Sequence, residues 1–298
     1  ACPELVERAC PELVERACPE LVEGVRERVP AADGGAGGQR PVLALARGHD
    51  EKALAGQVRV AERGVGGREA VVAQLVSQVK QDFFDDFGSL DPQNRQDQIL
   101  WVNDEDQCYV RDGLHGTREV GDGTLKLRVV DLGEPIECDN LNKFGDQHPP
   151  TRYVAGRLTS KNRREFVKGR WTARLRVPDS GQAGMFPAWW LLGARNNEPP
   201  VEEEDEDVCW PMTGSGEIDI FEHHSDGGPD HYAARAIKNL GYCGGGDWQQ
   251  LMHVQATTLA DYHEYAVEWE RSDLLFLLDG EVVYRGEGQG DQFPEPLF

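Results

Sequence analysis

Residues 216–224 read Gly-Glu-Ile-Asp-Ile-Phe-Glu-His-His, so acidic side chains alternate with large apolar ones. This alternation predicts a β-strand, because successive side chains of a strand point to opposite faces of its sheet. Glu217 and Asp219 then share one face, and Ile218 and Ile220 point to the other. Acidic side chains on one face repel each other and cost stability, so their presence together requires a functional reason.

A regular strand would place Glu222 on the apolar face with the isoleucines. One extra residue at Ile220–Phe221, a β-bulge, would return Glu222 to the acidic face. Bulges are frequent beside active sites because they re-aim a side chain. Three carboxyls on one wall suit retaining glycoside hydrolysis, which requires a nucleophile and a general acid.

The sequence from Phe83 onward consists of short strand-like segments separated by turns. Asp-Gly pairs at 112–113, 122–123 and 279–280 are hairpin signals. Many short strands without long intervening helices predict an all-β sandwich or barrel. The expected strands are 125–130, 171–177, 189–192, 217–222, 264–269 and 274–278.

Residues 1–82 have a different character, and we expect them to form a poorly structured extension. Residues 1–24 repeat the unit Ala-Cys-Pro-Glu-Leu-Val-Glu, followed by Arg or Gly. This period fits neither a helix nor a known solenoid, and each copy contains a proline. The repeat is interpreted as a translated repetitive element or a wrong start, with a cysteine-rich anchoring tail as the alternative. Residues 25–68 are rich in Gly, Arg and Ala, and residues 69–81 could form one short amphipathic helix.

The charge of the chain excludes several partners. The formal net charge is −22 at pH 7. It argues against binding of nucleic acid, whose phosphates would be repelled, and against anionic membranes. No run of about 18 apolar residues predicts a transmembrane helix. We expect a monomer that is kept in solution by its acidic surface.

Seven cysteines are present, and Cys108, Cys138, Cys209 and Cys243 lie outside the N-terminal repeat. No Cys-x-x-Cys pair occurs, so a zinc site is not expected. The four cysteines allow two disulfides in any of three connectivities, or they can all be free. Residues 202–207 are consecutive acids and are predicted to be a solvated insertion. Calcium binding there is not supported because the spaced ligands of a calcium loop are missing, and no cofactor is expected.

Trp210-Pro211, the acidic segment 216–222 and the apolar segment 185–193, with further segments in the right order, together resemble glycoside hydrolase family 16. Trp210-Pro211 followed by residues 216–222 is similar to the catalytic signature Glu-x-Asp-x-x-Glu of that family. Residues 185–193 (Met-Phe-Pro-Ala-Trp-Trp-Leu-Leu-Gly) resemble its Trp-Pro-Ala-Phe-Trp-Leu-Leu-Gly strand, with Phe186 in place of the usual Trp. The resemblance covers residues 83–298, and its further segments are 84–87, 153–160, 166–170, 261–269 and 278–280.

The resemblance implies a concanavalin-like β-jelly-roll of two curved antiparallel sheets with a glycan cleft on the concave face. It also implies retaining cleavage of β-linked polysaccharide. Carried over by position, Glu217 would be the nucleophile and Glu222 the general acid and then the general base. Asp219 would hold the protonation states of its neighbours apart. The two working carboxyls are expected about 5–5.5 Å apart.

The bulged spacing of the signature resembles laminarinases and other endo-β-1,3-glucanases, as well as agarases and carrageenases. The negative charge disfavours sulfated galactans, which leaves β-1,3-glucan or a related neutral polymer as the expected substrate. The resemblance implies an extracellular enzyme, although no signal peptide is visible in the chain. A non-catalytic glycan-binding jelly-roll and an inactive truncated fragment are the alternatives, and transglycosylation competes with hydrolysis.

Aromatic residues and histidines are candidates for sugar contacts. Trp210 matches the family tryptophan that stacks beneath a sugar, whereas Trp190 either lines the cleft or belongs to the core. His231 would replace a family histidine, but residues 233–239 depart from the usual pattern. His223 and His224 tune Glu222 or are loop residues, and the second interpretation is favoured.

The C-terminal residues 294–298 end before two further strands that the family normally has. This predicts a truncated chain with an unpaired sheet edge and a thinner core.

Overall fold

The computed structural model describes residues 81–298 except 257 and 271. The predictions for residues 1–80 lie outside the described residues. Almost all regular structure in the described part is β-strand, with three short 3₁₀ turns, η1 (Leu114–Gly116), η2 (Ser225–Gly227) and η3 (Gly290–Gln292). The strands are β1 (Gln96–Asp97), β2 (Cys108–Tyr109), β3 (Arg118–Gly121), β4 (Thr124–Leu127), β5 (Val129–Ile136), β6 (Thr151–Ala155), β7 (Leu158–Thr159), β8 (Gly169–Leu175), β9 (Ala188–Leu192), β10 (Glu217–Glu222), β11 (His231–Asn239), β12 (Gly246–Gln255), β13 (His263–Glu270), β14 (Asp273–Leu278) and β15 (Glu281–Gly286).

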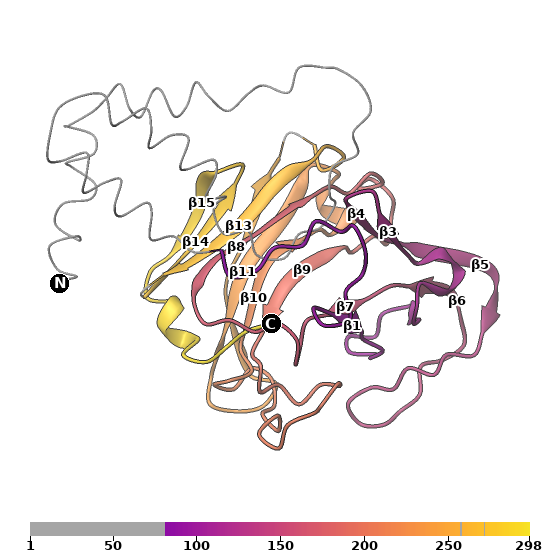
Figure 1. Cartoon of the computed structure of the whole chain (residues 1–298), viewed down its shortest axis with the longest axis horizontal. Helices are drawn as coiled ribbons and strands as arrows, with labels where there is room; N and C mark the ends of the chain where they lie inside the picture. The colour runs from indigo at the N-terminus through magenta and orange to yellow at the C-terminus, as the bar shows by residue number, and fades with distance from the viewer. Residues whose placement is uncertain (1–80, 257, 271) are drawn as a thin grey trace, which may run out of the picture. The chain divides into compact units, whose positions relative to one another are not determined.

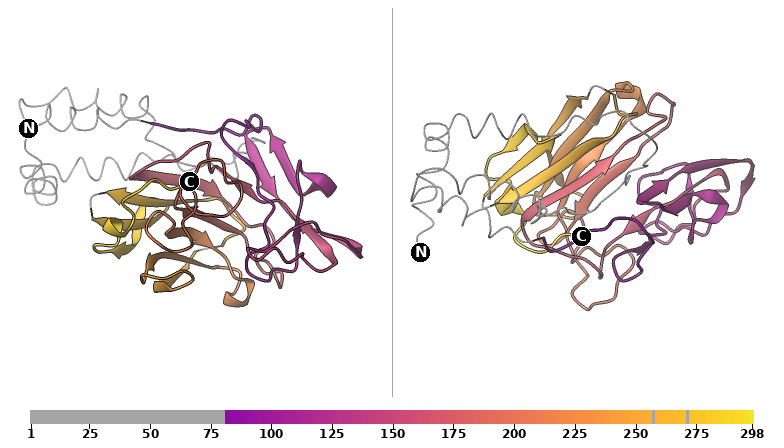
Figure 2. Two further views of the ribbon diagram at one scale, coloured as in Figure 1. Left: turned by 90° about the horizontal axis from the view of Figure 1, so that it is seen from below. Right: turned by 45° about the horizontal axis from the view of Figure 1, so that its top comes forward.

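Two four-stranded antiparallel sheets form the sandwich, in the orders β12-β11-β10-β9 and β15-β14-β13-β8. Their strands run from rose (β8) and salmon (β9) through orange to yellow in Figure 1, and Figure 2 shows them from two further directions. Apolar side chains from both sheets pack together in one core. The fold is the β-jelly-roll sandwich that the sequence predicts. Five of the six expected strands are present, and the expected strand 125–130 is divided between β4 and β5, which belong to different sheets.

The inner faces of the strands supply the core between the sheets. Ile218 and Ile220 of β10 are 0% and 2% exposed, in contact with the cluster that contains Trp171, Tyr265 and Trp269. Complete burial of one such side chain contributes about 1.5–3 kcal/mol. The core therefore fixes which face of β10 points inward, and the acidic residues of that strand lie on the opposite face.

The Asp-Gly pairs at 122–123 and 279–280 join β3 to β4 and β14 to β15, as predicted. Both residues of each pair have positive φ, which is the conformation of a tight hairpin turn. The hairpin predicted at 112–113 is wrong. That pair leads into η1, and the preceding strand β2 pairs in parallel with β6 instead.

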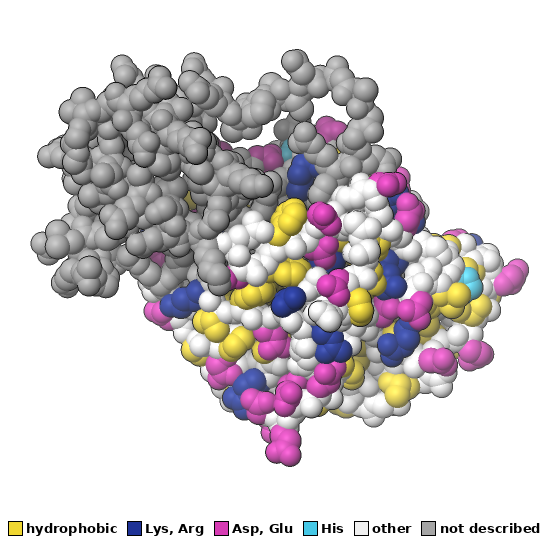
Figure 3. Space-filling model, viewed as in Figure 1, with side chains coloured by type: hydrophobic (Ala, Val, Ile, Leu, Met, Phe, Trp, Pro, Cys, Tyr) yellow, Lys and Arg dark blue, Asp and Glu magenta, His cyan; other side chains and the backbone are white. Residues whose placement is uncertain are grey.

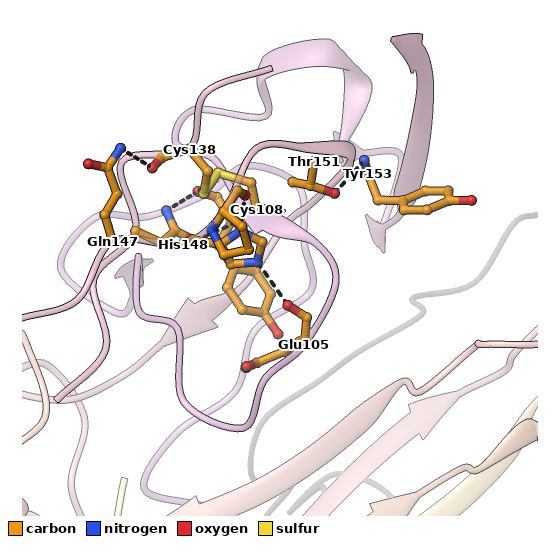
Figure 4. Close-up of a disulfide and its surroundings, with 10 residues drawn as sticks. Glu105, Cys108, Cys138, Gln147, His148, Thr151 and Tyr153 are labelled. Carbon is orange, nitrogen blue, oxygen red and sulfur yellow. Dashed lines mark hydrogen bonds between the residues drawn. A yellow bond between two sulfur atoms is a disulfide. The ribbon is translucent and has the colours of Figure 1, made fainter. Parts of the chain in front are cut away.

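The structure settles which cysteines pair, a question that the sequence left open. Cys108 bonds to Cys138, and Cys209 bonds to Cys243. The first disulfide is buried in a small apolar cluster beside β6, where Gln147 donates a hydrogen bond to the Cys138 carbonyl at 2.9 Å (Figure 4). The second lies next to the residues of the predicted site.

The acidic insertion at 202–207 is solvated only in part, and the prediction is wrong for Glu206. Glu206 is 5% exposed, and its carboxylate forms an ion pair with Lys161 Nζ at 3.0 Å. The same ammonium donates to the backbone carbonyls of Asn196 and Glu198, at 2.6 and 2.8 Å. A buried charge requires such a partner, because desolvation without one costs several kcal/mol. The pair therefore anchors the segment that leads toward β10.

The last residues of the chain lie along β9, the edge strand of its sheet. Leu192 and Phe298 exchange two backbone hydrogen bonds, at 3.1 and 2.9 Å, and Leu297 does the same with Phe166 at 3.0 and 2.9 Å. The edge strand β9 is thus paired at Leu192. The predicted truncation itself stays a prediction.

The surface view in Figure 3 shows acidic side chains mixed with Lys and Arg on the visible face of the described part. Among the residues that the structure describes, no helix is both long and apolar enough to cross a membrane.

Candidate active site

The bulge predicted in β10 is present. The register of β10 shifts against β9 between Asp219 and Phe221, and against β11 between Asp219 and Glu222. The shift places Glu222 on the acidic face, because one arginine of β11 donates to both Asp219 and Glu222. The alternation of the sequence therefore predicted the strand, and the position of Glu222 out of that alternation predicted the bulge.

Trp210, Glu217, Asp219 and Glu222 lie together, as the sequence predicted. Trp210 Nε1 donates a hydrogen bond to Glu217 Oε2 at 2.6 Å. Arg235 Nε donates to Asp219 Oδ2 at 2.8 Å, and its Nη2 donates to Glu222 Oε2. Arg235 is the residue of this cluster that sequence reasoning missed. The departure of residues 233–239 from the family pattern was the available signal, but it does not tell which side chain faces the acids.

Burial and mutual repulsion control the protonation of the carboxyl cluster. Burial raises the pKa of Glu217 to about 7; hydrogen bonds from Asp219 and Trp210 counter this shift, and the charge of Glu222 adds to it. Burial likewise raises the pKa of Asp219 well above its usual range, together with the charges of Glu217 and Glu222. Oδ1 of Asp219 is buried, and no N–H donor of the described residues reaches it. A proton held by Asp219 and donated to Glu217 therefore satisfies both groups and favours the ionised form of Glu217.

A cavity of about 320 Å³ opens beside Glu222. Its lining includes His224, Asp226, His231 and Tyr232. His231, predicted to contact the substrate, is half-buried there, and its Nδ1 has no hydrogen-bond partner among the described residues. A space of this size next to a carboxyl is suited to a small polar group such as part of a sugar ring.

The other candidate aromatic and histidine residues have separate positions. Trp190 pairs with Asp219 across β9 and β10, is half-buried, and has the Arg157 guanidinium 5.3 Å from its ring centroid. His223 is fully buried and bonds to the carbonyls of Ser180 and His231, at 2.7 and 2.8 Å. His223 therefore holds backbone segments together. His224 is exposed and lies in the cavity that Glu222 also lines.

Comparison with the profiles of known families tests the resemblance that the sequence motifs suggest. The profile described as Glycosyl hydrolases family 16 matches residues 121–297, more than half of the chain. The chain belongs to glycosyl hydrolases family 16. Its membership agrees with the jelly-roll sandwich and with the position of the bulged acidic strand.

Individual members of family 16 resemble the chain at moderate identity. A beta-glucanase of Rhodothermus marinus is 28% identical over 62% of this chain and 55% of its own length. A glucan endo-1,3-beta-glucosidase of Cryptopygus antarcticus is 27% identical over 62% of this chain and 59% of its own length. The chain thus spans little more than half the length of these curated relatives. A crystallised LamA variant from Z. galactanivorans, in complex with laminaritriose and laminaritetraose, is 26% identical with a TM-score of 0.57, and the match covers 72% of this chain and 84% of that one.

Proposed function

We propose that the protein is an endo-acting, retaining glycoside hydrolase that cleaves β-linked polysaccharide, with β-1,3-glucan as its substrate. The observation that carries the proposal is the bulged strand β10, which gathers Glu217, Asp219 and Glu222, with Glu217 bonded to Trp210 Nε1. A nucleophile and an acid/base carboxyl on one wall are what double displacement requires.

In the first step, Glu217 attacks the anomeric carbon while Glu222 gives its proton to the glycosidic oxygen. The bond from the anomeric carbon to that oxygen breaks, the leaving chain departs as an alcohol, and a glycosyl ester forms on Glu217. In the second step, water attacks the anomeric carbon and gives a proton to Glu222. The ester bond breaks, and Glu217 is released as a carboxylate.

The neighbours of Glu217 support its assignment as the nucleophile. A nucleophilic carboxyl must be ionised, yet burial raises its pKa to about 7. The hydrogen bonds from Trp210 and from protonated Asp219 act in the opposite direction. Both donors stabilise the carboxylate before attack, and Trp210 also offers an indole face on which the apolar side of a sugar can stack.

The substrate class is supported by the similar proteins and by charge. The relative from Cryptopygus antarcticus is named a glucan endo-1,3-beta-glucosidase, and the LamA structure from Z. galactanivorans holds laminaritriose and laminaritetraose. A net charge of −22 disfavours polyanionic substrates such as sulfated galactans. We place Trp210, Trp190 and His231 among the sugar contacts and propose that the enzyme acts outside the cell as a monomer. Light scattering that gives the mass of one chain would support the last point.

The test is release of reducing ends from a panel of laminarin, lichenan, agarose and κ-carrageenan. We expect release from laminarin, and we expect Glu217→Gln to lower it about 10³-fold or more, the scale for loss of a nucleophile. Laminari-oligosaccharide binding, measured by calorimetry, should survive because the amide keeps the shape of the site. Glu281→Gln, at an exposed position of β15, is the matched control and should leave the rate unchanged.

Two results would overturn the proposal. Binding of laminari-oligosaccharides without cleavage by the unmutated chain would favour the glycan-binding alternative. Retained activity in Glu217→Gln would assign the nucleophile to another residue. Product analysis by NMR separates hydrolysis from transglycosylation, and a β-configured first product is the result expected for retention.

A further inference from the structure

Arg235 stands in the middle of β11, directly opposite Asp219 of β10. Its guanidinium donates from Nε to Asp219 Oδ2 at 2.8 Å and from Nη2 to Glu222 Oε2. The side chain is 13% exposed, and Asp219 and Glu222 are 1% and 9% exposed. One planar fork thus joins two buried carboxyls that would otherwise repel each other.

The contact restricts how Glu222 can carry a proton. Arginine donates hydrogen bonds but cannot accept them. Because Nη2 already donates to Oε2, a proton on Glu222 is best held by Oε1. The guanidinium thus leaves Oε1 of Glu222 to carry the proton and fixes the orientation of the carboxyl. The cavity beside Glu222 would receive the leaving sugar.

The contact also affects the charge of the cluster. Burial alone would lower the pKa of Arg235, but the charges of Asp219 and Glu222 and the hydrogen bonds to them raise it above its ordinary value. A permanent cation bonded to a carboxylate stabilises the ionised form, and a general acid must be protonated to work. Arg235 therefore orders Glu222 and places a permanent positive charge against its carboxyl.

We propose that Arg235 is a positioning residue that acts through Glu222, orienting one carboxyl oxygen toward the leaving group and setting the upper pH limit of proton delivery. The proposal deepens, and rests on, the proposed hydrolase function. The other charged or titratable groups of the described residues that face Glu222 are Glu217 and Asp219 on β10, His231 and Tyr232 on β11, and His224 and Asp226 in the loop after β10. Arg235 is the one that bonds directly to the Glu222 carboxylate in the described part of the chain.

The test compares Arg235→Gln and Arg235→Lys with the unmutated protein on laminarin across pH. Loss of the cation in Arg235→Gln should make protonation of the acid easier, so the basic limb of the kcat/KM profile should move up by about one pH unit, with the maximum lowered about tenfold or more. Arg235→Lys keeps the charge without the fork. Its limb should stay near that of the unmutated enzyme while kcat falls, because the carboxyl is less well oriented.

A chosen substrate separates proton delivery from general damage. An aryl laminaribioside with a dinitrophenolate leaving group departs without a proton, so Arg235→Gln should lose much less activity on it than on laminarin. Arg170→Gln is the matched control. Arg170 also bridges two carboxylates, Glu268 at 2.8 Å and Glu264 at 3.0 Å, but in the other sheet. Its variant should leave the basic limb unmoved.

A second readout does not depend on activity. ¹³C-carboxyl NMR of the labelled protein, with the Glu222 signal assigned by Glu222→Gln, should give a titration midpoint that rises by about one unit in Arg235→Gln. A midpoint and a basic limb that both stay unchanged would overturn the proposal and leave Arg235 a purely structural residue. If the unmutated chain cleaves no glucan, the proposed function fails, and the NMR titration still decides the role of Arg235.

Discussion

Asp219 lies between Arg235, which needs a hydrogen-bond acceptor, and Glu217, which is stabilised by a hydrogen-bond donor. Its Oδ2 accepts a hydrogen bond from Arg235 Nε, which requires an acceptor at that oxygen. Glu217 gains if the same carboxyl carries a proton and donates it, and burial raises the pKa of Asp219 enough to permit this. A singly protonated Asp219 meets both requirements, since each of its oxygens then has one role. The middle acid of the signature would thus be a hydrogen-bond donor to Glu217, the proposed nucleophile.

This arrangement predicts different pH profiles for two substitutions of Asp219. The hydrogen bond from Asp219 lowers the pKa of Glu217, so Asp219→Ala should raise it further above 7. Because the nucleophile must be ionised, the acidic limb of kcat/KM on laminarin should move to higher pH, with about a tenfold to hundredfold loss at pH 6. Asp219→Asn keeps an N–H donor, and its acidic limb should remain near that of the unmutated enzyme. Equal limbs in both variants would contradict a donor role.

At this site, the features that the sequence predicts lie close together along the chain, whereas the feature it misses comes from a distant strand. The three acids and the bulge lie within residues 216–222: the period of two places Glu217 and Asp219 on one face, and the extra residue that Glu222 needs to join them marks the bulge. Arg235 faces them only because β11 pairs with β10 in one register, and a shift by one residue would turn it to the other face. The pairing of Lys161 with Glu206 joins distant segments in the same way.

At the scale of elements, Trp210 is held by the segments on both sides of it. Cys209 forms a disulfide with Cys243, and the Gly244 N–H donates to the Trp210 carbonyl at 2.7 Å. These bonds tie the segment that precedes β10 to the connection between β11 and β12. The Trp210 indole, which donates to Glu217, is therefore oriented by an element far along the chain.

We expect the Cys209–Cys243 disulfide to matter for catalysis as well as for stability. Replacing both cysteines by Ala should lower the free energy of unfolding by about 2–5 kcal/mol, and should also lower kcat/KM at 25 °C because the indole loses its anchor. Replacing Cys108 and Cys138 is the matched control, with a sequence separation of 30 against 34. That variant should lose comparable stability and keep its activity. Urea unfolding and laminarin kinetics measure the two effects, and equal activity in both variants would contradict the expectation.

At the scale of the whole described part of the chain, the sequence predicted the two-layer sandwich. It did not predict which cysteines pair or where the last residues lie. Alternating patterns mark the inner faces of β8, β10 and β13, so the two layers follow from local signals. The disulfide partners and the position of the last residues depend on contacts between distant segments, which periodicity does not encode. Residues 293–298 carry three apolar side chains that the structure buries, Phe293, Leu297 and Phe298, at 3%, 2% and 8% exposed.

The C-terminal segment should therefore contribute strongly to stability. Removing residues 294–298 takes Leu297 from the main core and Phe298 from its pairing with Leu192. Two buried side chains at about 1.5–3 kcal/mol each predict a loss of about 3–6 kcal/mol in the free energy of unfolding. Leu297→Ala alone should cost about 2–5 kcal/mol, because it leaves a cavity. Glu295→Ala, whose carboxylate is 31% exposed and 3.6 Å from Arg195, is the control and should cost no more than about 1 kcal/mol. Urea unfolding followed by tryptophan fluorescence gives each value. A shortened chain that unfolds at the same urea concentration as the full chain would show that the pairing along β9 adds nothing to the stability of the sheet.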